Sequence, residues 1–152
     1  MTAQVVGSRS GVVVGVDGSA GSGQALKWAV AEARLRGAPL TVVHAWHQTS
    51  PVSFVGGYLG TPMLYDVDLF EKAAQQVLDE AVDSVDTTGL ADPVVRKVIQ
   101  DGASAALVGA SSDADLLVVG ARGVGGFPGL LVGSVTTQVT HHASCPVVVV
   151  PA

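Results

Sequence analysis

The chain is poor in cysteine and in charged residues, and both shortages exclude certain classes of protein. It has one cysteine, Cys145, so no disulfide can form within the chain, and we expect this side chain to be a small buried hydrophobe. Charged residues make up 14% against 48% hydrophobic residues, which argues against a disordered chain. The net charge of −5 argues against nonspecific nucleic-acid binding, which needs a basic face.

Signals for membrane insertion or export are also missing. No apolar run reaches about 18 residues, so no membrane span is predicted. The first residues, MTAQVVGSRSG, lack the basic-then-apolar pattern of a signal peptide. We therefore expect a cytoplasmic protein. A chain of 152 residues can bury a core of its own, and we expect one domain over 10–152 after a flexible segment 1–9.

Short apolar runs alternate with helical patterns along the chain. This order predicts a parallel sheet covered by helices on both faces, in a doubly wound α/β fold of flavodoxin-like or Rossmann-like type. A long loop is expected over 47–66, and Asp101 is expected to cap the third helix. The predicted strands are Val12–Asp17, Leu40–Trp46, Val94–Gln100, Asp115–Gly120 and Pro146–Val150, and the predicted helices are Ala20–Arg36, Val67–Val85, Ala103–Ala110 and one opened by Ser134.

A glycine-rich loop follows the fourth predicted strand, after Gly120. Glycines bring a backbone close to a ligand, and a helix N-terminus attracts anions, so strand, glycine loop and helix together predict a phosphate site. The loop contains no P-loop lysine, the first strand–helix turn has no G-x-G-x-x-G, and no G-x-S-x-G elbow occurs. In one common winding the first and fourth strands are neighbours, which would bring Asp17 beside this loop.

Several side chains near this loop each have two interpretations. Ser134 either only caps its helix or also donates to a phosphate, and Thr136 either reaches the same anion or faces solvent. Asp17 either forms an Asx turn before Gly18 or contacts a sugar hydroxyl or base edge. Arg122 either screens a phosphate or is simply solvated.

The sequence predicts neither a metal site nor catalytic machinery. His141 and His142 are adjacent and cannot share a helix face, and His44 and His47 flank Trp46 with no carboxylate nearby in sequence. No Ser-His-Asp or Cys-His set can be singled out. We therefore expect a binding cleft rather than a catalytic centre.

The last predicted strand is apolar at every position and is expected to lie on a sheet edge. An exposed apolar edge invites aggregation, so something is expected to cover 146–150. A second subunit is one solution, which predicts a homodimer; coverage by the N-terminal segment of the same chain is the other.

The chain resembles the universal stress protein family over about residues 10–151. The start VVVGVDGS, the second strand LTVVHAW and the end LLVVGARG…GLLVGSV…CPVVVV carry the resemblance. The nucleotide motif of that family, G-x2-G-x9-G-[ST], is matched by Gly120, Gly123, Gly133 and Ser134 with both spacings intact. The resemblance implies a flavodoxin-like three-layer sandwich with a five-stranded parallel sheet in the order 3-2-1-4-5.

It also implies an ATP site, with Mg²⁺ or Mn²⁺ held by the phosphates and no dedicated protein ligands, and a dimer joined through the last strand. The implied ATP-binding residues are Gly15 and Asp17 on the first strand, Ala45 on the second, and Gly120, Arg122, Gly123, Gly133, Ser134, Val135 and Thr136 around the loop. Two residues depart from the family pattern. Gly15 replaces a frequent proline, which we expect to loosen the adenine-side wall, and Ala121 replaces a frequent serine. Pro128 is expected to restrict the opening of the loop.

The function implied is a non-catalytic, ATP-binding regulator of stress responses that acts as a switch or sensor for an unknown protein partner. ATP would order 121–132 and the mouth formed with 47–66, and a partner would recognise that surface. Two alternatives stay open: slow ATP hydrolysis or autophosphorylation, and binding of AMP or cyclic AMP.

Overall fold

The structure is a computed structural model that describes residues 11–47, 67–123 and 132–151. Strands and helices alternate throughout these residues, as the sequence predicts. The elements are β1 (Val12–Gly15), α1 (Ala20–Arg36), β2 (Leu40–Trp46), α2 (Val67–Asp83), β3 (Val95–Gln100), α3 (Ala103–Ser111), β4 (Leu116–Gly120), α4 (Ser134–His142) and β5 (Val147–Val150). The expected flexibility of 1–9 and the expected loop over 48–66 lie outside the described residues.

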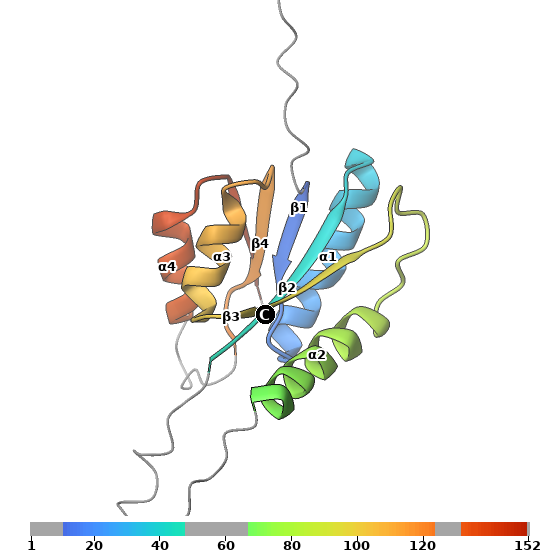
Figure 1. The fold of residues 1–152 in the computed structure, drawn as a ribbon. Helices are drawn as coiled ribbons and strands as arrows, with labels where there is room; N and C mark the ends of the chain where they lie inside the picture. The colour runs from blue at the N-terminus through green and yellow to red at the C-terminus, as the bar shows by residue number, and fades with distance from the viewer. Residues whose placement is uncertain (1–10, 48–66, 124–131, 152) are drawn as a thin grey trace, which may run out of the picture.

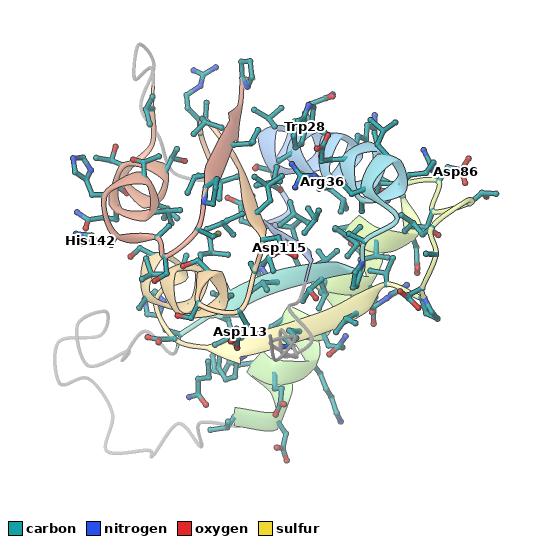
Figure 2. The ribbon with its side chains drawn as sticks, turned by 90° about the horizontal axis from the view of Figure 1, so that it is seen from above. Trp28, Arg36, Asp86, Asp113, Asp115 and His142 are labelled. Atoms are coloured by element: carbon teal, nitrogen blue, oxygen red, sulfur yellow. The ribbon has the colours of Figure 1, made fainter. Side chains whose placement is uncertain are left out.

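The five strands form one parallel sheet in the order β3-β2-β1-β4-β5, which confirms the predicted topology. Helices α1 and α2 cover one face of the sheet, and α3 and α4 cover the other (Figure 1). The same layers are visible from above in Figure 2. Because β1 lies between β2 and β4, the first and fourth strands are neighbours, with Val12 opposite Leu116.

The core lies on both faces of the sheet because alternate residues of each strand point to opposite sides. Val12 and Val14 pack with α1 and α2, whereas Val13 packs with Leu107 of α3 and Val139 of α4. Burial on both faces explains why β1 and β4 contain no polar side chain. None of the helices in the described ranges is long and apolar enough to cross a membrane.

The ends of two helices show where sequence patterns succeed and fail. Helix α1 begins after the N-cap Ser19, whose Oγ accepts from Ser22 N, and it ends at Gly37 with φ of 58°. The prediction that Asp101 caps α3 is wrong. The N-cap is Gly102, and the Asp101 carboxylate accepts from the N–H of Gly102 at 2.7 Å rather than from a helical residue. The bounds of α1 and β2 match the predicted ones, and the other predicted bounds differ from the observed ones by at most two residues.

An ion-pair cluster joins the edge strand β3 to α2. The Arg96 guanidinium donates to Asp79 at 2.7 Å and to Asp83 at 2.9 Å. The hydrogen bond from Arg96 lowers the pKa of the Asp79 carboxyl below its ordinary value. The cluster therefore contributes most above the pH range in which Asp79 titrates.

Candidate nucleotide site

A cavity of about 290 Å³ lies at the carboxyl ends of β1, β2 and β4. All the residues that the family resemblance assigns to ATP line it, although they come from four separate parts of the chain. The cavity also has lining residues that sequence reasoning missed: Val16, Ser22, Val43, Ala103, Leu107 and Val119. The structure thus brings the predicted set together, in the crevice where ligands bind in open α/β sheets.

Two backbones approach each other closely beneath the cavity, and glycines make this possible. A Cβ at Gly21, in the first turn of α1, would lie 2.7 Å from the carbonyl oxygen of Arg122. A Cβ at Gly120 would lie 3.0 Å from the carbonyl oxygen of Gly21. The turn after β1 and the loop after β4 therefore pack backbone against backbone, with no room for a side chain between them.

Asp17 lies at the mouth between β1 and β4. Its Oδ1 accepts from the N–H of Ser19 at 2.9 Å, so the expected Asx turn is present. Its Oδ2 occupies the space where a Cβ at Gly123 would lie. The same carboxylate thus both shapes the turn and borders the glycine loop. Its predicted contact to a sugar or base stays a prediction.

The N-terminus of α4 opens into the cavity. The N-cap is Gly133, with φ of −72° and ψ of 164°, so the interpretation of Ser134 as the helix cap is wrong. Ser134 is instead the first helical residue, and its side chain is exposed. The N–H of Gly133 donates to the carbonyl of Ala121 at 2.7 Å and is already used. Within the described residues, the N–H groups of Ser134, Val135 and Thr136 have no backbone acceptor, as is usual in a first helical turn.

Thr136 lies in the first turn of α4 and lines the cavity, and its hydroxyl has a partner within the protein. It is buried, and its hydroxyl donates to the carbonyl of Gly120 at 2.7 Å. Because a hydroxyl has a single proton, this bond leaves Thr136 no O–H to donate to an anion. Contact between this hydroxyl and a phosphate stays a prediction and would require the bond to Gly120 to break, whereas the alternative of a solvent-facing threonine is wrong. The side chain instead holds α4 against the end of β4.

The wall beside Gly15 is tight, contrary to the sequence prediction. A Cβ at Gly15 would lie 2.8 Å from Cδ1 and 2.9 Å from Cδ2 of Leu107. The side chain of Leu107 therefore fills the space that a larger residue on β1 would occupy. Arg122 is exposed at the rim of the cavity, and both of its roles stay predictions. Pro128 lies outside the described residues.

Among the described residues, metal-ligating side chains are sparse around this cavity. The described ranges contain no group of three His, Cys, Asp or Glu side chains that could hold a metal ion. His44 donates from Nδ1 to the carbonyl of Val16 at 2.8 Å, and His142 lies on the outer side of α4 (Figure 2). Cys145 is half-buried rather than buried as predicted, although it packs against the core and burial raises the pKa of its thiol.

Comparison with known proteins identifies the family. The model of the universal stress protein family matches residues 10–151. The chain belongs to this family. Universal stress protein Rv2623 of Mycobacterium tuberculosis (strain ATCC 25618 / H37Rv) is 37% identical over 147 residues, which cover 94% of this chain but 48% of that protein. The chain thus spans about half the length of the curated relatives that it matches.

Two solved universal stress proteins with nucleotides share the architecture of this one. One, in complex with cAMP, is 27% identical, has a TM-score of 0.67 and covers 95% of this chain and 98% of its own. Another, from Archaeoglobus fulgidus in complex with dAMP, is 26% identical, has a TM-score of 0.63 and covers 93% of this chain and 98% of its own. Nucleotide binding is therefore found among the structural neighbours of this universal stress protein.

Proposed function

We propose that this universal stress protein binds ATP at the cavity, with the phosphates at the N-terminus of α4. The observation that carries the proposal is the placement of the G-x2-G-x9-G-S residues. Gly120, Gly123, Gly133 and Ser134 all line one cavity, and the N–H groups after Gly133 point a positive helix end toward it. Ser134 adds an exposed hydroxyl at the same end.

The nucleoside would lie toward β1 and β2, near Asp17 and Ala45, where the resemblance places the base. Apolar side chains of Val43, Leu107 and Val119 also line the cavity, which suits the binding of a base. Mg²⁺ or Mn²⁺ would accompany the phosphates. No cluster of metal-ligating side chains is present in the described part of the chain. The phosphate oxygens of the nucleotide would therefore supply most of the ligands of the ion.

We infer that the protein acts as a regulatory switch in stress responses rather than as an enzyme. Among the described residues that line the cavity, Asp17 is the only carboxylate, and its Oδ1 is used by the turn; none is a histidine or lysine. Such a site holds a nucleotide without an evident general base. The protein partner that would recognise the ATP-bound state, and the cytoplasmic location, stay predictions.

A thermal-shift series on nucleotide-stripped protein tests the proposal. ATP should raise the melting temperature, and more so with Mg²⁺, because a ligand that binds only the folded state stabilises it. Ser134→Ala should weaken ATP binding, whereas Gln138→Ala, exposed on the same helix, should not. An unchanged melting temperature with ATP would refute the proposal.

AMP or cyclic AMP is a second candidate ligand, because the two similar structures above contain cAMP and dAMP. Adding ADP, AMP and cyclic AMP to the same series separates the candidates. If AMP stabilises the protein as much as ATP does, the α4 N-terminus contributes little for the outer phosphates. Phosphate release measured over hours tests the alternative of slow hydrolysis, which would contradict a purely binding role.

We also propose a homodimer joined through β5. This strand lies at the edge of the sheet, and Val147–Val150 are only half-buried. A second subunit would cover the apolar edge, and the curated relatives, about twice as long, have chain enough for a second such unit. Light scattering during size-exclusion chromatography should give the mass of a dimer; a monomer at micromolar concentration would contradict the proposal.

A further inference from the structure

A closed set of hydrogen bonds links Asp17 to the first turn of α1. The N–H of Ser19 donates to Asp17 Oδ1 at 2.9 Å, and the N–H of Ser22 donates to Ser19 Oγ at 3.2 Å. In return, the hydroxyl of Ser22 accepts from the N–H of Asp17 at 3.2 Å and donates to the carbonyl of Ser19 at 3.0 Å. Asp17 is therefore held from both its main chain and its side chain.

Ser22 is the buried member of this set. Its residue is 6% exposed, and it lines the cavity. Its single hydroxyl proton is used by the carbonyl of Ser19, so this side chain has no O–H to donate to a ligand. We therefore expect Ser22 to affect binding mainly through Asp17, whose main-chain N–H donates to the Ser22 hydroxyl.

The position of the Asp17 carboxylate matters because the glycine loop is fitted against it. Oδ2 occupies the space beside Gly123, and the next contact between the same turn and the loop, Gly21 with Arg122, leaves no room for a Cβ. A small displacement of the turn would move the carboxylate relative to the loop. The turn holds the Asp17 carboxylate directly, whereas the N–H groups at the start of α4 are linked to the turn only through residues 120–123 of the loop.

We propose that Ser22 is a positioning residue of the nucleotide site, whose hydroxyl fixes the turn so that the Asp17 carboxylate meets the nucleoside end of the ligand. The inference rests on the proposed binding of ATP. It predicts that losing the hydroxyl weakens recognition of the nucleoside and leaves recognition of the phosphates unchanged. The side chain of Ser19 cannot take over this role, because Ser19 binds the Asp17 carboxylate through its main-chain N–H.

The test is isothermal titration with ATP, adenosine and inorganic tripolyphosphate. Ser22→Ala should weaken ATP and adenosine by about three- to tenfold, the range for one hydrogen bond, with tripolyphosphate unchanged. Ser19→Ala is the matched control. It removes the N-cap oxygen and should lower the melting temperature, yet it keeps the main-chain bond to Asp17 and the ratio of ATP to tripolyphosphate affinity. Ser22→Thr keeps the hydroxyl and should restore that ratio.

Each outcome decides the question. If Ser22→Ala weakens tripolyphosphate as much as ATP, or weakens neither, the positioning role is wrong. If wild-type protein binds no ATP at all, the proposed function fails, which the wild-type titration shows before any variant is made. A measurement without variants adds to this: the amide of Asp17 should exchange slowly in hydrogen-exchange NMR, and rapid exchange would contradict the bond to Ser22.

Discussion

The hydroxyl of Thr136 donates to the main-chain carbonyl of Gly120 at 2.7 Å. A second bond, from the N–H of Gly133 to the carbonyl of Ala121 at 2.7 Å, lies beside it. The two bonds close the glycine loop at its base, so α4 begins directly beside the end of β4. The geometry of the proposed phosphate site depends on this closure.

Thr136→Val should therefore weaken both the fold and the site. It removes the donor to a carbonyl in a buried setting, which should lower the free energy of unfolding by about 1–2 kcal/mol. ATP affinity should fall as well, because the start of α4 is no longer held against β4. Urea denaturation and calorimetry measure the two effects. Thr140→Val is the control, since Thr140 is exposed on the same helix; equal losses in both variants would contradict the role of Thr136.

Two glycines in the first turn of α1 should respond in opposite ways to alanine. Gly21→Ala places a Cβ 2.7 Å from the carbonyl oxygen of Arg122, so we expect a loss of about 1–3 kcal/mol in the free energy of unfolding. Gly23→Ala meets nothing within 4 Å and should gain about 0.5–1 kcal/mol from helix propensity. Denaturant melts of both variants check the pair, and a gain in Gly21→Ala would show that the two backbones are not closely packed.

A double-mutant cycle tests the contact between Asp17 and Gly123. Gly123→Ala alone should destabilise the protein, because its Cβ collides with Asp17 Oδ2. In the background of Asp17→Ala the obstacle is gone, so the same glycine substitution should cost less. We expect a coupling free energy of about 1 kcal/mol in unfolding experiments. Strictly additive effects would mean that the two residues do not share this space.

The Arg96 cluster predicts a pH dependence. In the folded protein the pKa of Asp79 lies below its ordinary value of 3.8, chiefly because Arg96 donates to it. The stabilisation is therefore fully present above pH 3.8 and is lost as the pH falls through the lowered pKa. In Arg96→Gln the pKa of Asp79, followed by NMR of its carboxyl carbon, should rise toward 3.8. Lys97→Gln, at the next position on β3, should leave it unchanged.

Much of the fold and of the candidate site is encoded in local patterns. The apolar runs Val12–Asp17 and Asp115–Gly120 predict parallel strands, and neighbouring parallel strands place Asp17 beside the glycine loop. Ser22 was missed because its role depends on a helical turn folding back on Asp17. The spacing of Ser19 and Ser22 directly after Asp17 was the available signal. Leu107 had no such signal, since α3 is a short apolar helix whose inward side cannot be read from its sequence.

Several of the errors concern hydroxyl and carboxylate groups at helix starts. Asp101 and Ser134 each lie one residue from the N-cap, and a shift of one residue turns a capping group into one with a different partner. For Thr136, the sequence suggests a polar side chain near an anion, but the closest acceptor in the fold is the carbonyl of Gly120. Such competition between acceptors is decided by tertiary packing.

The pairing of β1 with β4 must form during folding before the cavity is complete. Val12 lies opposite Leu116, so this pairing closes a long loop of chain, an entropically costly and slow step in folding. The cavity has no complete wall until that step is finished. If a fluorescent nucleotide is added during refolding, the time course of its binding at the proposed site should therefore report when the central sheet assembles. The bound nucleotide should also slow unfolding.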